Sequence, residues 1–186
     1  MRIGVLRGVI LPFTLVAAMV GCKIQRPATL SSSTETAKVG VGPVPPIPDA
    51  AERETVYVAR VIDGDTVELG DRRLVRLAGI DAPESKHPGK PIECMAFEAG
   101  RFLREQVEHR EVELVLDKQR QDKYRRVVGH IVLAGRYVNA ELVERGLAIV
   151  YRARRSDRDA ILDAAEKRAQ SKHLGLWSSH CRGLGN

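Results

Sequence analysis

Two kinds of charged residue punctuate the chain between residues 63 and 126. They are the carboxylates Asp63, Asp65, Asp81 and Glu84 and the arginines Arg76 and Arg126. Carboxylate oxygens are ligands of the kind that Ca²⁺ prefers, and a carboxylate near a bound metal can activate or orient water. Arginine stabilises charge on a phosphoryl group. Together these residue types indicate metal-dependent hydrolysis of a phosphodiester bond.

Four motifs, in order along the chain, resemble the staphylococcal nuclease (thermonuclease) family. They are residues 61–84, the loop Ser85-Lys86-His87-Pro88, the turn Asp122-Lys123-Tyr124 with its arginine, and Gly175-Leu176-Trp177. The resemblance covers the chain from about residue 55 to residue 177. It implies the OB-fold of that family and a nuclease domain over residues 55–181, with a short tail at 182–186.

The resemblance also implies a metal site. Asp65 and Asp81 would ligate Ca²⁺ together with the backbone carbonyl of Ala82, and Asp63 would support them from outside the coordination shell. Three protein donors are few for an ion that takes six to eight oxygens, so we expect weak binding, with a dissociation constant of about 10⁻⁴–10⁻³ M. The alternative is that these aspartates are ordinary turn residues beside glycine.

Catalysis and phosphate binding follow from the same resemblance. Glu84 is the expected general base, or the residue that orients the attacking water, while Arg76 and Arg126 form a phosphate clamp. The turn departs from the family at one position, because Arg125 stands where a glycine is usual. If that position needs a positive φ, arginine there costs about 1 kcal/mol or more, and Arg126 could be displaced.

Substrate contacts are less specific. The expected residues are Lys86, Lys123, Tyr124 and Tyr151. Lysines suit phosphate contacts that have no sequence preference. Stacking of an open base on tyrosine favours single-stranded or breathing DNA and RNA. The net charge of +6 agrees with a polyanionic substrate. The sequence has no zinc-ligand spacing, no phosphate-binding glycine loop and no serine–histidine signature.

The elements that must position these residues are short. Alternating apolar residues predict strands at 56–61 and 111–117. The turns at Asp63-Gly64, Gly70-Asp71 and Ala134-Gly135 bound further strands at 66–69, 73–80 and 127–133, the last with a hairpin leading to 136–138. Apolar residues at helical spacing predict helices at 98–108, 139–145 and 157–172, the second with Asn139 as its N-cap and Gly146 as its stop. Five short strands with about three helices favour an α+β fold, a five-stranded OB-fold β-barrel.

The N-terminus is typical of an export signal. Arg2 and Arg7 precede an apolar run at 9–20 that is too short to span a bilayer. We expect a signal peptide over 1–21 that ends in a bacterial lipoprotein-type motif, with Cys22 lipidated. An ordinary cleaved signal with an incidental cysteine is the alternative. Residues 23–54 are rich in serine and proline and predict a flexible tether. The protein would then be exported, held in the cell envelope by its lipid anchor alone, and monomeric.

Three cysteines are an odd number for an exported protein. If Cys22 carries lipid, Cys94 and Cys181 remain, and an oxidising compartment favours their pairing. Members of the family have cysteines near these two positions. Two free thiols are the alternative.

Three functions remain open on these residues. The first is an exported Ca²⁺-dependent nuclease for DNA and RNA that has little sequence preference and leaves 3′-phosphate ends, as the resemblance implies. The second is a non-catalytic nucleic-acid-binding OB-fold lipoprotein. The third is a structural envelope lipoprotein, in which the charged motifs would serve only to form turns.

Overall fold

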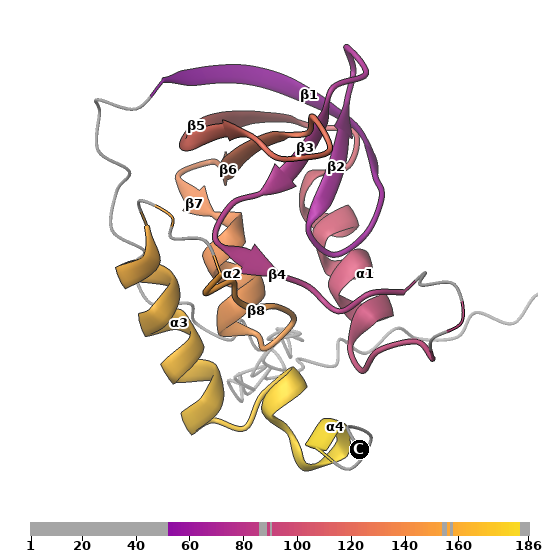
Figure 1. Ribbon diagram of the computed structural model, residues 1–186, viewed down its shortest axis with the longest axis vertical. Coiled ribbons are helices and arrows are strands. Elements are labelled where there is room, and N and C mark those ends of the chain that lie inside the picture. The colour runs from indigo at the N-terminus through magenta and orange to yellow at the C-terminus, as the bar shows by residue number, and fades with distance from the viewer. Residues whose placement is uncertain (1–51, 86–88, 90, 154–155, 157, 183–186) are drawn as a thin grey trace, which may run out of the picture. The chain divides into compact units, whose positions relative to one another are not determined.

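The computed structural model describes residues 52–85, 89, 91–153, 156 and 158–182 (Figure 1). The expected signal peptide, the lipidation site Cys22 and nearly all of the expected tether lie outside the described residues. Within the described part, every helix is too short or too polar to cross a membrane.

Five strands close into a barrel. They are β1 (Arg53–Val61), β2 (Thr66–Leu69), β3 (Leu74–Leu77), β5 (Glu111–Gln121) and β6 (Val127–Leu133). The ring runs antiparallel in the order β3-β2-β1-β5-β6, and a parallel pairing of β6 with β3 closes it. A two-residue strand, β7 (Arg136–Tyr137), pairs antiparallel with the end of β6. This barrel with its helices confirms the α+β OB-fold expected from the sequence.

The first strand begins earlier than expected. Arg53 and Glu54 fall within the predicted tether, but they pair with Val115 and Leu114 of β5 and so belong to the barrel. The register of β1 against β2 shifts between Val58 and Arg60. This irregularity leaves Arg60 exposed while Val58 and Val61 are buried. Such bulges redirect a side chain without ending the strand.

The predicted strand 73–80 is wrong in one respect, because the chain bends inside it. β3 ends at Leu77, Gly79 adopts a φ of 72°, and β4 (Ile80–Asp81) pairs instead with β8 (Ile149–Val150). A Cβ atom at Gly79 would lie 2.5 Å from Leu162 Cδ1, so packing as well as φ requires glycine here. The bend takes Asp81 out of the barrel sheet and places it beside β8.

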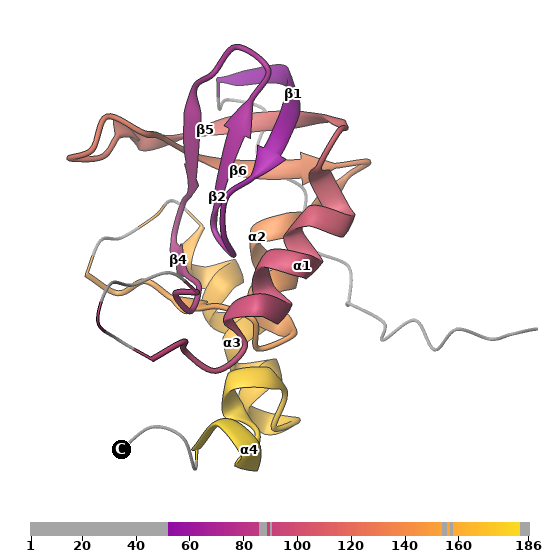
Figure 2. The same ribbon diagram turned by 90° about the vertical axis from the view of Figure 1, so that its right-hand side faces the viewer.

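Helices gather at one end of the barrel, as both views show (Figures 1 and 2). They are α1 (Ala96–Val107), α2 (Val138–Glu144) and α3 (Asp159–Ser171), followed by the 3₁₀ turn η1 (Gly175–Trp177) and α4 (Ser179–Arg182). The predicted helices match α1, α2 and α3 within about two residues at each end, a normal uncertainty of helix boundaries. Neither η1 nor α4 is predicted by the sequence pattern.

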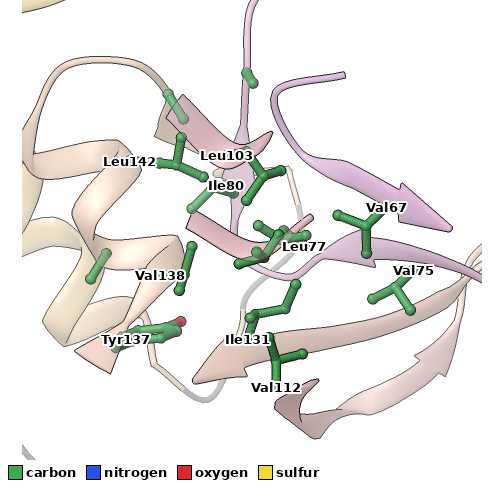
Figure 3. Close-up of a cluster of buried hydrophobic side chains, with 14 of the residues drawn as sticks. Val67, Val75, Leu77, Ile80, Leu103, Val112, Ile131, Tyr137, Val138 and Leu142 are labelled. Atoms are coloured by element: carbon green, nitrogen blue, oxygen red, sulfur yellow. The ribbon is translucent and has the colours of Figure 1, made fainter. Parts of the chain in front are cut away.

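One hydrophobic core joins the helices to the barrel (Figure 3). Leu103 of α1 and Leu142 of α2 meet Leu77, Ile80 and Ile131 from the strands. All five side chains are almost fully buried. The helices therefore cover the open end of the barrel and fix the strand ends, where the charged residues lie.

Asn139 is not the helix N-cap that the sequence pattern predicts. Helix α2 begins at Val138, and Asn139 lies inside it with its side chain fully buried. Its Oδ1 accepts a hydrogen bond from the Ile131 N–H at 3.0 Å, and its Nδ2 donates one to the Ala78 carbonyl at 3.0 Å. Because buried polar groups need partners, the carboxamide serves two backbone groups of the barrel rather than the helix end.

A disulfide joins the two ends of the helical layer. Cys94, just before α1, is bonded to Cys181 in α4, with an S–S distance of 2.02 Å and a sequence separation of 87. The bond therefore links the C-terminal segment to the residues that follow the loop after Glu84.

Candidate active site

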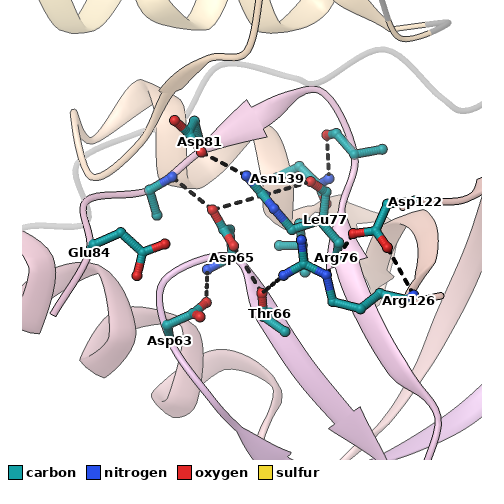
Figure 4. A network of polar contacts seen from close by, with 12 residues as sticks. Asp63, Asp65, Thr66, Arg76, Leu77, Asp81, Glu84, Asp122, Arg126 and Asn139 are labelled. Atoms are coloured by element: carbon teal, nitrogen blue, oxygen red, sulfur yellow. Dashed lines mark hydrogen bonds and ion pairs between the residues drawn. The ribbon is translucent and has the colours of Figure 1, made fainter. Parts of the chain in front are cut away.

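Arg76 lies at the centre of the acidic cluster (Figure 4). Its Nη1 is 2.8 Å from Asp65 Oδ2, and its Nη2 is 2.8 Å from Asp81 Oδ1. Its side chain is only 15% exposed. A partly buried guanidinium needs charged or polar partners, and here both partners are predicted metal ligands. Strand pairing explains the contact, because Arg76 is the cross-strand neighbour of Thr66, which follows Asp65.

The β1–β2 turn presents Asp65 to the residues after β4. The Asp65 carboxylate accepts hydrogen bonds from the Ala82 N–H at 2.9 Å and from the Thr66 hydroxyl at 3.0 Å. The Asp65 N–H donates to Asp63 Oδ1 at 3.0 Å. A Cβ atom at Gly64 would lie 2.6 Å from the Ala82 Cβ atom. The turn therefore needs glycine to bring Asp65 and Ala82 together.

The acidic side chains fit a cation. Burial raises the pKa of Asp65 from 3.8 to about 7 against the opposing effect of Arg76, and burial likewise raises the pKa of Asp81. Carboxylates that resist ionisation in this way are stabilised by a nearby positive ion. Among the described residues, no three His, Cys, Asp or Glu side chains form a group that could hold a metal by themselves. The metal site expected from the sequence, Asp65 and Asp81 with the Ala82 carbonyl, therefore stays a prediction.

Glu84 follows the β4 strand and borders the same cluster, with its carboxylate directed toward the Asp63–Asp65 turn (Figure 4). Burial raises its pKa, and the charges of Asp63 and Glu93 raise it further. A carboxylate whose pKa is raised toward neutral is better suited to accept a proton from water. The position and the electrostatics of Glu84 agree with the role expected from the sequence.

Glu93 belongs to the site although nothing in the sequence predicts it. The Glu84 N–H donates to Glu93 Oε2 at 2.9 Å, and the Glu93 N–H donates to the Glu84 carbonyl at 3.3 Å. Glu93 thus holds the backbone of the expected base and adds negative charge beside it. The sequence places Glu93 next to Cys94, but no local pattern indicates that its side chain returns to Glu84.

The turn with the substituted glycine keeps its shape. Arg125 adopts a φ of 65°, the conformation that glycine would take. Asp122 holds the turn through hydrogen bonds to the backbone N–H groups of Tyr124 and Arg126, at 2.8 and 3.0 Å. The turn therefore accepts arginine at this position.

Arg126 is not displaced. Its Nε is 2.7 Å from Asp122 Oδ2, and its Nη1 donates to the Thr66 hydroxyl at 3.3 Å. Since Thr66 also bonds Asp65, Arg126 and Arg76 reach neighbouring points of one site. The structure brings together both arginines of the predicted clamp.

A pocket of about 290 Å³ opens beside this site. Among its lining residues are Arg76, Asp81, Lys123, Tyr124, Arg126 and Tyr151. Tyr124 is 67% exposed. The Lys123 ammonium lies 4.9 Å and the Arg126 guanidinium 5.4 Å from its ring centroid. Three of the four expected substrate residues thus meet in one pocket, and the fourth, Lys86, lies outside the described residues.

A buried polar network supports the wall of this pocket. His130 is hydrogen-bonded to the Tyr137 hydroxyl at 2.7 Å and to Asp117 Oδ2 at 3.1 Å. Asp117 also accepts a bond from the Ser156 hydroxyl at 3.0 Å, and both residues line the pocket. Burial alone would raise the pKa of Asp117, but the hydrogen bonds from His130, Gln119 and Ser156 lower it. His130 has no role predicted from the sequence, because an isolated histidine in a strand carries no signal.

Comparison with known proteins agrees with the geometry. Residues 74–179 match the family model described as staphylococcal nuclease homologue. A thermonuclease of Staphylococcus intermedius is 33% identical over 142 residues, which are 74% of this chain and 84% of that protein. A thermonuclease of Staphylococcus hyicus is 33% identical over 134 residues, 69% of this chain and 79% of that protein. A protein of Verticillium alfalfae named "Probable endonuclease LCL3" is 35% identical over 130 residues, 66% of this chain and 45% of that protein.

Proposed function

The chain belongs to the staphylococcal nuclease family, and we propose that it is a Ca²⁺-dependent nuclease for DNA and RNA that leaves 3′-phosphate ends. The names of its relatives, thermonuclease and endonuclease, support hydrolysis of nucleic acid. The observation that carries the proposal is the contact of Arg76 with both Asp65 and Asp81, beside Glu84 and Arg126. This arrangement supports a site that combines phosphate recognition with cation binding.

Asp65, Asp81 and the carbonyl of Ala82 are the residues that would hold Ca²⁺. When bound, the ion supplies positive charge to the phosphoryl oxygens. The pKa values of Asp65 and Asp81, both raised by burial, support a site that favours a cation. Asp63 supports Asp65 by accepting its backbone N–H. We expect weak binding, with a dissociation constant of about 10⁻⁴–10⁻³ M.

The residues of the chain divide the reaction between them. Glu84 orients the attacking water and takes one of its protons as the water oxygen bonds to phosphorus. The bond to the 5′-oxygen breaks, and the leaving oxygen takes up a proton from solvent. Arg76 and Arg126 donate hydrogen bonds to the phosphoryl oxygens, whose charge grows in the transition state. The guanidinium fork stays charged and matches two oxygens at once.

The pocket beside the clamp would bind the adjoining nucleotide. Tyr124 and Tyr151 offer faces for an unstacked base, and Lys123 offers a phosphate contact. Stacking accepts any base, so little sequence preference follows. Because a base must leave the duplex to stack in this way, single-stranded or breathing substrates are favoured. Lys86 is proposed as a further phosphate contact from the sequence alone.

The cellular setting is proposed from the sequence. A leader over 1–21 would direct export, lipidation of Cys22 would anchor a monomer in the cell envelope, and residues 23–54 would serve as the tether. The disulfide between Cys94 and Cys181 supports an oxidising compartment.

Cleavage of heat-denatured DNA tests the function. The protein would be assayed with Ca²⁺ at about 10⁻³ M, the range expected for such a site, and with EGTA. Wild type would be compared with Glu84→Gln and with Glu98→Gln, a matched change at an exposed position of α1. We expect Ca²⁺-dependent cleavage that only Glu84→Gln strongly reduces. DNA binding without cleavage by the folded wild type would favour the non-catalytic OB-fold binding protein instead.

A further inference from the structure

The outer face of the β1–β2–β3 sheet continues outward from the catalytic arginine. Thr66 of β2 pairs with Arg76 of β3, and two residues further along the same strands Glu68 pairs with Leu74. Side chains two positions apart in a strand share a face. The intervening residues Val67 and Val75 point into the barrel and are fully buried. Glu68 and Leu74 therefore lie one step from the phosphate clamp on the same outer face.

A shallow groove of about 420 Å³ runs over this face. Thr66 and Arg126 line it at the end nearest the clamp, while Arg60, Arg72 and Leu74 line it further out. Arg126 also lines the pocket that contains Tyr124. It therefore stands where the two depressions meet, and a phosphate bound by Arg126 would have one depression on each side.

Two guanidinium groups are fixed in the groove by one carboxylate. Glu68 is nearly buried, and its two oxygens hold Arg60 Nη2 at 2.6 Å and Arg72 Nη1 at 3.2 Å. The Arg60 and Arg72 side chains remain 65% and 87% exposed. A guanidinium has five N–H donors, and each ion pair uses one nitrogen of the fork. Both forks therefore keep donors that can reach a phosphate.

Apolar surface accompanies these charges. Leu74 is 40% exposed, and Ile62 lines the same groove. Exposed apolar side chains beside fixed guanidinium groups suit a sugar or base attached to a phosphate. Three arginines and two carboxylates, Asp63 and Glu68, line the groove, so positive charge is in excess. The arrangement is thus complementary to a polynucleotide segment, with guanidinium groups for its backbone and an apolar surface for its nucleosides.

We infer that this groove is a second nucleotide subsite, which binds the polynucleotide strand on the side of the scissile phosphate opposite to the Tyr124 pocket. A strand that crosses Arg126 would lie in both depressions at once. The inference rests on the proposed function, since it takes Arg126 as the residue at the scissile phosphate. It adds a preferred substrate class to that function, namely strands that extend on both sides of the cleaved bond. Such strands would bind more tightly than strands that extend on one side only.

Binding of short single-stranded oligonucleotides tests the subsite. A dinucleotide would be extended separately by a few nucleotides at its 5′ end and at its 3′ end, and affinities would be measured by fluorescence anisotropy in EGTA. Arg60→Gln and Arg72→Gln would be compared with wild type. Each single variant leaves Glu68 one arginine partner. We expect extension at one end to tighten binding in wild type and to do so several-fold less in either variant, while extension at the other end has equal effects in all three proteins.

Salt dependence gives a second readout. For strands that fill the groove, the slope of log affinity against log salt concentration should shrink by roughly 0.7 for each phosphate that the variant no longer neutralises. Arg73→Gln is the matched control, because Arg73 belongs to the same β2–β3 hairpin but pairs with Glu54 and Asp71 outside the groove. Its slope should equal that of wild type. Thermal unfolding of each variant would show that the proteins compared are folded.

Two results separate the subsite from the function on which it rests. If each extension tightens binding by the same factor in wild type and in every folded variant, the subsite is overturned, even if Ca²⁺-dependent cleavage is intact. If the protein neither binds nor cleaves any strand, the proposed function fails and the subsite fails with it. If Arg60→Gln or Arg72→Gln is poorly folded, the triple variant Arg60→Gln/Glu68→Gln/Arg72→Gln removes the carboxylate with its partners and serves in its place.

Discussion

Glu93 is hydrogen-bonded to both the backbone N–H and the backbone carbonyl of Glu84. The Glu84 N–H donates to the Glu93 carboxylate at 2.9 Å, and the Glu84 carbonyl accepts the Glu93 N–H at 3.3 Å. Glu84 is thereby fixed where the chain leaves β4. In the proposed reaction Glu93 is a positioning residue, because its bonds reach Glu84 and not the substrate.

Loss of the Glu93 side chain should impair catalysis more than binding. We expect Glu93→Ala to lower kcat by about 10- to 100-fold, the range expected when a catalytic group shifts by a fraction of an ångström to an ångström, with a small change in KM. Glu93→Gln keeps an acceptor for the Glu84 N–H and should retain most of the activity. Steady-state kinetics on single-stranded DNA would measure both. An unchanged kcat in Glu93→Ala would rule out the positioning role, and Glu98→Ala is the control on α1.

Removal of the disulfide should destabilise the fold. Cys94 and Cys181 are 87 positions apart in the sequence, so we expect Cys94→Ser/Cys181→Ser to lower the free energy of unfolding by about 2–5 kcal/mol. Activity at low temperature should fall as well, because Cys94 adjoins Glu93. Urea unfolding with and without reductant measures the first effect. Wild type treated with reductant should match the double variant, and a double variant that melts like oxidised wild type would contradict the expectation.

Glycine at position 125 should stabilise the protein. Arg125 has a φ of 65°, a conformation that costs a side-chain-bearing residue about 1 kcal/mol more than glycine. We expect Arg125→Gly to raise the free energy of unfolding by up to about 1 kcal/mol and to leave kcat nearly unchanged, since Arg126 already contacts Thr66. Lys123→Gly in the same turn, where φ is not positive, should lower stability. A lower stability of Arg125→Gly would show that the arginine makes compensating contacts.

Without metal, stability should fall as the pH rises through the weakly acidic range. Burial raises the pKa of Asp65 from 3.8 to about 7 in the folded protein. Between these values the folded state keeps a proton that the unfolded chain has lost, so the free energy of unfolding decreases with rising pH. In Asp65→Asn this decrease should be smaller. Urea midpoints in EGTA across this interval measure it.

The exposed residue Asp71 provides the control for that experiment. A backbone hydrogen bond from Arg73 lowers its pKa, so its contribution is lost only as the pH falls below the interval. Asp71→Asn should therefore leave the slope unchanged. Added Ca²⁺ should restore stability mainly at the higher pH, where Asp65 is ionised. If wild type and Asp65→Asn show the same slope, Asp65 ionises in the folded state near its ordinary pKa.

The barrel strands were predictable because short runs rich in β-branched and apolar residues lie between turn residues. Strand 66–69 and strand 127–133 match β2 and β6 in full, since Gly70 follows the first and Ala134-Gly135 the second. The bend at Gly79 was not predictable, because apolar residues continue past it in the sequence. Only the packing of Leu162 against Gly79 and the pairing of β4 with β8 reveal it.

The residues of the candidate site were more predictable than the residues that hold them in place. Asp65, Arg76, Asp81, Glu84 and Arg126 lie in motifs whose residue types indicate their chemistry, and the structure brings them together. Asn139, Glu93 and His130 act through contacts with residues 61, 9 and 7 positions away, at 3.0, 2.9 and 2.7 Å respectively. None of these pairs lies within one strand or one helix, so neither the strand period nor the helix period indicates them. The one local conflict, Arg125 in place of glycine, was visible in the sequence, and its outcome depended on how Asp122 holds the turn.

The parallel pairing of β3 with β6 has a consequence for folding kinetics. Arg76 lies opposite Val128, two residues after Arg126, so this pairing brings the two arginines to neighbouring positions. The β1–β2–β3 meander and the β5–β6 hairpin are local and can form early, whereas the two pairings that join them, β1 with β5 and β3 with β6, connect distant segments and must overcome a larger loop-closure entropy. In a refolding experiment, nuclease activity should therefore reappear with the slowest phase, after most secondary structure has formed. The rate at which activity reappears would then measure the rate at which the barrel closes.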